Sequence, residues 1–196
     1  MNRETFHHGD LSPALLELAE RELKTSGYED LSLRSLAKQL GVSQTAPYRH
    51  FKDRSAFLAA LSECGGKRLH ESYLKAIAQG QTHAQRLRLV CASYIRFALS
   101  EPEMFRLIYA VNAHGSESVL MEQLASFRLF MELVGTTHEL TDPKERQTAA
   151  FTCWSTLHGY VMLRLSGLAM QQAFLEEIED SVIAVACTYV PPSGKL

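Results

Sequence analysis

Apolar residues recur at three- and four-residue steps along most of the chain, and no segment alternates apolar and polar residues as a half-buried strand does. Only 11 of the 196 residues are glycine and 6 are proline, so residues that break helices are scarce. With 46% hydrophobic residues the chain can bury a core, which excludes disordered chains and disulfide-stapled mini-proteins. The sequence therefore predicts an all-α fold.

The four cysteines lie far apart in sequence, and none belongs to a CxxC pair or a Cys/His cluster. This spacing argues against a zinc site and favours reduced, mostly buried thiols. Charged and polar residues follow Met1, and no apolar run reaches the length of about 18 residues that a membrane span needs. We expect a cytoplasmic protein with no membrane segment, no metal site and no cofactor, and we exclude secreted and collagenous classes.

Positive charge is concentrated in one short segment of an otherwise acidic chain. Residues 32–54 hold five basic residues and one acidic residue, whereas residues 1–31 hold three basic and seven acidic residues. The net charge of the whole chain is −2. Because affinity for nucleic acid depends on the charge that faces the phosphates, this segment predicts a local phosphate-binding surface.

Three short helices are predicted within the first fifty-five residues. The start and stop signals are Ser12, Pro13 and Gly27 for the first helix, Ser32 and Gly41 for the second, and Ser43 as the cap of a third helix from Gln44 to Phe51. Two short helices joined by a tight turn at a glycine form a helix-turn-helix, whose second helix enters the major groove of DNA.

The same residues carry a family resemblance. Leu33–Ser43, which includes Ala37-x-x-x-Gly-Val-Ser, and Tyr48–Asp53, which includes Tyr-x-His-Phe, resemble the DNA-binding domain of the TetR/AcrR family of transcription regulators. The lead-in His7–Leu11 is also similar to members of this family. The resemblance implies a helix-turn-helix domain over residues 1–54, followed by a larger helical ligand-binding and dimerisation domain over residues 55–196.

One segment departs from the family pattern. Thr45-Ala46-Pro47 stands where the family often has Gly-Thr-Leu. Proline lacks an N–H, and its ring presses on the carbonyl four residues earlier, here that of Ser43. We therefore expect a distorted opening turn of the third helix. This departure favours a second hypothesis, a helical ligand-binding or scaffold dimer without specific operator recognition.

Candidate DNA-contacting residues follow from helix-turn-helix geometry. Gln44 can pair with adenine and Thr45 can touch a thymine methyl group, while Arg49 is an alternative reader of guanine. Phosphate contacts are expected from other polar residues of the segment, because such contacts fix register without reading sequence. The full predicted set is Arg34, Ser43, Gln44, Thr45, Tyr48, Arg49, His50 and Lys52. The alternative for each is an ordinary solvated helix face.

Six further helical stretches are predicted after the basic segment. They run from Arg54 to about Ile77 with Asp53 as the cap, from Thr82-x-x-Gln85, from a Ser100–Glu103 capping box, over 116–134, from Asp142 through Ser166, and from about Phe174 to Val190. The first contains Gly65-Gly66, for which tight packing, a break between two helices and a pliable joint are all open interpretations.

The stretch through Ser166 is apolar on nearly every face, and such a helix has to be covered all round. An identical helix across a two-fold axis, with the last helix beside it, would cover it, and the resemblance implies the same dimer. Trp154-x-x-x-His158-Gly159 resembles the signature of one C-terminal subgroup of the family.

Trp154 and His158 are four residues apart and share a helix face, where they could line a ligand chamber. The candidate lining residues are Tyr94, Phe97, Phe105, Ile108, Tyr109, Trp154, His158 and Met162. Ordinary core is the alternative for each. No GxSxG, HExxH, P-loop or GxGxxG occurs, and no acid is placed to orient Ser155 and His158, so no enzyme is expected. The sequence predicts a homodimeric regulator, most simply a repressor of a palindromic operator, released by a small, largely apolar ligand.

Overall fold

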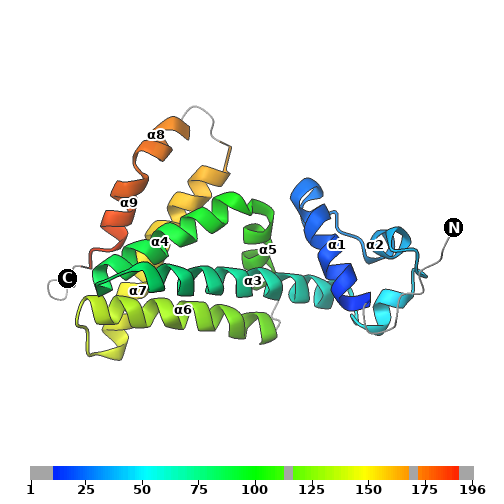
Figure 1. Ribbon diagram of the computed structural model, residues 1–196, viewed down its shortest axis with the longest axis horizontal. Coiled ribbons are helices and arrows are strands. Elements are labelled where there is room, and N and C mark those ends of the chain that lie inside the picture. The colour runs from blue at the N-terminus through cyan, green and yellow to red at the C-terminus, as the bar shows by residue number, and fades with distance from the viewer. Residues whose placement is uncertain (1–10, 113–116, 168–171, 190–196) are drawn as a thin grey trace, which may run out of the picture. The chain divides into compact units, whose positions relative to one another are not determined.

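The computed structural model describes residues 11–112, 117–167 and 172–189. Within these ranges the regular structure is entirely helical, which confirms the predicted all-α fold (Figure 1). The elements are α1 (Leu11–Ser26), α2 (Leu33–Gln39), η1 (Ala46–Arg49), α3 (Arg54–Gln79), α4 (His83–Ser100), α5 (Pro102–Asn112), α6 (Glu117–Thr137), α7 (Pro143–Leu165), α8 (Gln172–Glu177) and α9 (Glu179–Ala186).

The helices group into two compact units. The N-terminal unit comprises α1, α2, η1, the part of α3 up to Gly66, and residues 101–121 with α5. The C-terminal unit comprises the rest of α3, α4, α6 from Glu122, and α7 to α9. The domain boundary predicted at residue 54 stays a prediction, and the lead-in residues 7–10 lie outside the described residues.

The N-terminal unit is built on α1, which packs against α2, η1 and α5. Apolar residues of α1 and α2 at helical spacing are buried together, as the periodicity predicts. Both helices end at the glycines that the sequence marked as stops, Gly27 and Gly41. Their φ angles of +73° and +70° lie in the left-handed region that favours glycine.

The predicted third helix is wrong in extent and in type. Instead of an α-helix over 44–51, the structure has the short 3-10 helix η1. In an α-helix the N–H of residue 47 would donate to the carbonyl of Ser43, but Pro47 has no N–H. That carbonyl instead accepts the N–H of Ala46 at 3.0 Å, the i→i−3 bond of a 3-10 helix. The expected distortion at Pro47 therefore extends through the whole segment.

Three predicted helix caps are confirmed by hydrogen bonds to backbone N–H groups. Asp53 accepts from Ala56 at 2.8 Å, Thr82 from Gln85 at 3.2 Å, and Asp142 from Glu145 at 2.8 Å. Gln85 also accepts from the N–H of Thr82 at 3.3 Å, which completes the capping box.

Three other predicted serine caps are not formed. Ser32 stands at the N-cap of α2 without a side-chain capping bond. Ser43 lies with its hydroxyl 3.2 Å from that of Thr45. Ser100 is the last residue of α4 and donates to the carbonyl of Phe97 at 3.2 Å. Its hydroxyl therefore closes α4, and the predicted Ser100–Glu103 capping box is wrong.

Helix α3 runs without interruption through Gly65 and Gly66, so the interpretation of a helix break is wrong. A Cβ atom on Gly65 would lie 2.4 Å from Sδ of Met104 and 3.1 Å from Cδ1 of Ile108, both on α5. Met104 and Ile108 are themselves buried. Glycine at position 65 therefore lets α5 pack directly against the backbone of α3 within the N-terminal unit.

The predicted last helix is divided into α8 and α9 at Ile178. In an unbroken helix the carbonyl of Leu175 would accept the N–H of Glu179. That carbonyl instead accepts the Tyr160 hydroxyl of α7 at 2.8 Å. A side chain that enters the i→i−4 ladder is a recognised cause of a kink. Helix α9 ends at Ala186, so the predicted extent to about Val190 is too long, and Val190 itself lies outside the described residues.

Candidate DNA-binding surface and ligand site

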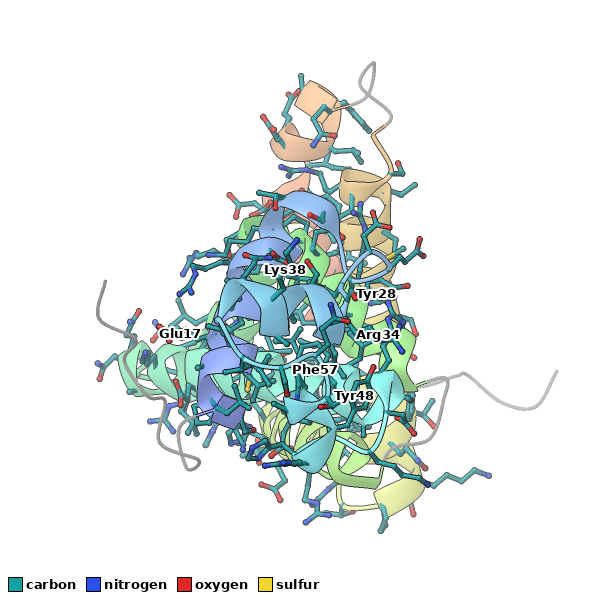
Figure 2. All side chains as sticks on the ribbon, turned by 90° about the vertical axis from the view of Figure 1, so that its right-hand side faces the viewer. Glu17, Tyr28, Arg34, Lys38, Tyr48 and Phe57 are labelled. Atoms are coloured by element: carbon teal, nitrogen blue, oxygen red, sulfur yellow. The ribbon has the colours of Figure 1, made fainter. Side chains whose placement is uncertain are left out.

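All eight predicted DNA-binding residues have exposed side chains in the N-terminal unit. They are Arg34 on α2, Ser43, Gln44 and Thr45 in the following turn, Tyr48 and Arg49 on η1, and His50 and Lys52 after it. We call these residues, with Lys38 of α2, the basic surface. Figure 2 labels Arg34, Lys38 and Tyr48 on the part of the N-terminal unit that is turned to the viewer. Helices α2 and η1 pack together, so their side chains share one local surface.

Two buried residues anchor η1 beneath the basic surface. Pro47 is buried, and the ring of Phe51 packs edge-on against that of Phe57 of α3, with centroids 5.2 Å apart. Phe51 is itself buried. The short 3-10 helix is therefore fixed to the core on one side while its polar side chains remain outside.

Arg54 has a structural role that sequence reasoning missed. Its guanidinium donates to three backbone carbonyls, those of Leu31 at 3.1 Å, Tyr28 at 2.7 Å and Glu29 at 2.8 Å. These carbonyls belong to the link between α1 and α2. Counting charge gave Arg54 the same weight as its basic neighbours, but this arginine holds the link in place.

The predicted ligand residues fall into two groups. Tyr94, Phe97, Trp154, His158 and Met162 lie in the C-terminal unit, and Phe105, Ile108 and Tyr109 lie on α5 in the N-terminal unit. In the first group Phe97 is buried, whereas Met162 is 46% exposed. In the second group Phe105 and Ile108 are buried, and the rings of Phe105 and Tyr109 are in contact, with centroids 4.7 Å apart.

Tyr94, His158 and Trp154 are brought together between α4 and α7. The Tyr94 hydroxyl lies 2.8 Å from Nδ1 of His158, and the Trp154 ring stacks on the His158 ring at 5.2 Å with an angle of 33° between planes. Tyr94 is buried and His158 is half-buried. The spacing of Trp154 and His158 predicted that they share a face, and the structure adds Tyr94 as the polar partner.

Burial lowers the pKa of His158 below its ordinary value of 6.5, because an imidazolium is poorly solvated there. The unfolded chain therefore takes up this proton at a higher pH than the native protein does. We expect the free energy of unfolding to fall, through this residue, as the pH drops below about 6.5. His158→Gln should remove that part of the pH dependence. Urea unfolding of both proteins at pH values on either side of 6.5 measures the free energy of unfolding. The same pH dependence in both proteins would contradict the expectation.

An aromatic cluster adjoins this pair, and sequence reasoning missed two of its members. Phe127 of α6 packs on Phe151 of α7, with centroids 4.7 Å apart, and both rings lie edge-on to Trp154 at 6.4 and 6.0 Å. In the sequence, Phe127 and Phe151 are only members of the helical apolar stripes of 116–134 and of the stretch from Asp142 through Ser166. No local signal showed that these stripes face each other.

Large apolar side chains are exposed on the last three helices. They are Phe151, Met162 and Leu163 on α7, Phe174 on α8 and Val185 on α9. We call this set the exposed apolar face. A shallow open groove follows the first half of α7, and its lining residues, from Lys144 to Thr156, all belong to that helix. A Cβ atom on Gly159 of α7 would meet nothing within 4 Å, so the packing of the chain itself does not require glycine there.

The described residues contain neither a membrane-spanning helix nor a metal-binding cluster. None of their helices is both long enough and apolar enough to cross a bilayer. No group of three or more His, Cys, Asp or Glu side chains in the described ranges is arranged to hold a metal ion.

Two protein families match the chain. Residues 15–61 match the family described as bacterial regulatory proteins of the tetR family. Residues 87–186 match the tetracyclin repressor-like C-terminal domain. Together the two matches cover the helix-turn-helix segment and most of the C-terminal unit.

Individual proteins are similar to this chain over different lengths. The nucleoid occlusion factor SlmA of Vibrio cholerae is 27% identical over 107 residues, which are 55% of this chain and 53% of that protein. The chain thus spans about half the length of the curated relatives it matches. A protein of unknown function from Rhodococcus sp. RHA1 has a solved structure with 29% identity and a TM-score of 0.77, covering 95% of this chain and 100% of that one.

The transcriptional regulator FadR from Bacillus subtilis, solved in complex with stearoyl-CoA, has the same fold. It is 15% identical with a TM-score of 0.69, and the match covers 91% of this chain and 98% of that chain.

Proposed function

The chain belongs to the TetR family of bacterial regulatory proteins, and we propose that it is a cytoplasmic homodimeric repressor of a palindromic operator, released by a small, largely apolar ligand. The family assignment makes it a DNA-binding transcription regulator with a ligand-binding C-terminal domain. The observation that carries the proposal is the basic surface. Eight residues selected from the sequence for DNA contact are all exposed, on an N-terminal unit whose core lies beneath them.

Each part of the basic surface has a distinct proposed role. Gln44, Thr45 and Arg49 meet base edges in the major groove, where amide and guanidinium groups can form paired hydrogen bonds with adenine and guanine. Arg34, Ser43, Tyr48, His50 and Lys52 contact phosphates and fix the register. A single unit of this size buries too little surface for a specific site, so two copies are needed on successive major grooves.

The exposed apolar face supports a dimer through α7, α8 and α9. Single exposed apolar residues are ordinary, but five large ones on three consecutive helices favour association with another chain. In a two-fold dimer α7 and the α8–α9 pair of each copy would form a four-helix interface. The open space around Gly159 suits the close approach of a second helix.

The Tyr94–His158 pair supports the ligand proposal. Apolar pockets use a few placed polar groups to orient their ligands, and this pair lies beside the rings of Trp154 and Phe127. The stearoyl-CoA bound to the Bacillus subtilis regulator joins a long apolar acyl chain to a polar, charged coenzyme A group. The ligand releases DNA only if it binds the conformer that no longer fits the operator more tightly than the DNA-competent one. Membership of the Trp-x-x-x-His-Gly subgroup is part of this proposal.

The second hypothesis, a ligand-binding or scaffold dimer without specific operator recognition, is favoured by one observation. The segment expected to be a recognition α-helix is a 3-10 helix of four residues. A gel-shift titration against the DNA upstream of its own gene, at two salt concentrations, separates the hypotheses. Selective, low-nanomolar binding supports the regulator. Weak binding that modest salt abolishes supports the alternative, because nonspecific binding is almost wholly electrostatic.

Lys52→Ala tests the phosphate contacts. We expect the affinity to fall evenly for all DNA sequences, and the slope of log affinity against log salt to flatten by about two, roughly one for each copy in the dimer. The matched control is Lys75→Ala, an exposed lysine of α3 in the C-terminal unit. Titrations at several salt concentrations measure both slopes. An unchanged slope for the Lys52 variant would remove this residue from the DNA contacts.

A further inference from the structure

Three cysteine thiols meet inside the C-terminal unit. Cys91 lies on α4, Cys153 on α7, and Cys187 directly after α9. The sulfur atoms of Cys91 and Cys187 are 3.6 Å apart, although the residues are 96 positions apart in sequence. Cys153 hydrogen-bonds to Cys91 as well. All three are free thiols. Neither DNA contact nor the Tyr94–His158 pair uses this cluster.

We propose that Cys91 and Cys187 are a modification site, a thiol pair that a peroxide converts into a reversible disulfide within one chain. A disulfide bond is about 2.05 Å long, so the two sulfur atoms must approach each other by about 1.5 Å. Cys187 is the C-cap of α9, and its N–H donates the last helical hydrogen bond, to the carbonyl of Ile183 at 2.9 Å, so a movement of its side chain disturbs only the end of the helix. Helices α4 and α9 already pack together, which keeps the required movement small.

The two thiols differ in burial and in pKa, as a reaction that oxidises one thiol before the other requires. Cys187 is half-buried, and a peroxide can reach it, whereas Cys91 is fully buried. The hydrogen bond from Cys91 lowers the pKa of Cys187, and the charge of Arg88 lowers it further, while partial burial opposes both. Hydrogen bonds to Cys153 and Cys187, together with burial, raise the pKa of Cys91. The thiolate, which is the reactive species, therefore forms more readily at Cys187.

The chemistry balances with a peroxide as the oxidant. The Cys187 thiolate attacks one oxygen of hydrogen peroxide, the O–O bond breaks, and a sulfenic acid and hydroxide result. The sulfur of Cys91 then attacks the sulfenic sulfur, the S–O bond breaks, and water leaves with the Cys91 proton. Two thiols and one peroxide thus give one disulfide and two waters. The two electrons lost by sulfur reduce the peroxide.

Cys153 is a poorer partner than Cys187. It is buried in the middle of the continuous helix α7, opposite Cys91 on the continuous helix α4, so neither backbone has a free end near the pair. The remaining cysteine, Cys64, belongs to the N-terminal unit. The geometry therefore specifies one pairing among the four cysteines.

Peptide mapping of the full-length protein tests the pairing. The reduced protein is treated with hydrogen peroxide under native conditions, then denatured, alkylated at its remaining thiols and digested. We expect a peptide crosslinked between Cys91 and Cys187, a mass lower by two hydrogen atoms per chain, alkylated Cys64 and Cys153, and full reversal by dithiothreitol. Cys153→Ser should form the same crosslink, and Cys187→Ser should leave Cys91 alkylated.

Three results would overturn the proposal. They are four alkylated cysteines after peroxide, a crosslink of Cys91 to Cys153 in place of Cys187, and a crosslink that joins two chains. Each can be read from the unsubstituted protein, so the test does not depend on the folding of any variant.

Discussion

Arg49→Ala is expected to weaken binding to the specific DNA site far more than binding to unrelated DNA. Arg49 is exposed at the end of η1, and a guanidinium that pairs with guanine contributes about 1–3 kcal/mol of discrimination. A two-fold dimer carries this contact twice, so the loss is roughly 2–6 kcal/mol, at least thirtyfold in affinity. Fluorescence-anisotropy titration against the specific site and its single-base variants measures both the loss and the relaxed preference.

Two further variants separate base reading from charge. Arg49→Lys keeps the charge but loses the paired geometry, so it should retain nonspecific affinity while losing preference at one base pair of each half-site. Arg96→Ala removes an exposed arginine of α4 in the C-terminal unit and should change neither quantity. If Arg49→Lys discriminated bases as well as the unsubstituted protein, Arg49 would be a phosphate contact instead of a base reader.

The double variant Leu163→Glu, Val185→Glu is expected to be a monomer at micromolar concentration and to lose specific DNA binding. These side chains are 48% and 64% exposed in the single chain, so the substitutions leave its own core intact. In the proposed interface each carboxylate would be buried without a partner, at a cost of roughly 3–5 kcal/mol each. Two-fold symmetry places four such charges in one interface. Dimerisation would be abolished, and with it the paired contact with DNA.

Leu74→Glu is the matched control for this experiment. Leu74 is 49% exposed, nearly the same as Leu163, but it lies on α3, outside the exposed apolar face. The Leu74 variant should remain a dimer and bind DNA as the unsubstituted protein does. Sedimentation velocity gives the mass of each species. A dimeric double variant, or a monomeric Leu74 variant, would place the interface elsewhere.

Local chemistry made much of the fold predictable. Helix ends at Gly27 and Gly41, and the caps at Asp53 and Asp142, depend on residues within one turn, and all are found as predicted. The exposure of the basic surface follows from the same local pattern, since apolar positions of α1 and α2 turn inward and leave polar ones outside.

The predictions that failed depend on contacts between residues far apart in the chain, or on the choice between alternative local backbone structures. The kink at Ile178 results from the hydroxyl of Tyr160, and the role of Arg54 results from carbonyls more than twenty residues earlier. The 3-10 geometry at Pro47 was expected only as a distorted turn, because the missing N–H shows that one α-helical hydrogen bond is lost but does not show which local structure replaces it.

Contacts among the candidate ligand residues were the least predictable feature. Helical spacing paired Trp154 with His158, but nothing in the sequence showed that Tyr94, from a helix 64 residues away, supplies the hydrogen bond to His158. The proximity of Cys91 and Cys187 was hidden for the same reason. Spacing along one helix predicts a shared face, and only the fold shows what lies opposite.

Selection of binding sites from a pool of random duplex DNA by the full-length protein tests the central proposal most directly. We expect enrichment of an inverted repeat whose half-sites lie about 34–36 Å apart, or a multiple of that distance, with two chains bound to each duplex. A selected pool no richer in any sequence than the starting one, or a lone half-site bound by one chain, would contradict it.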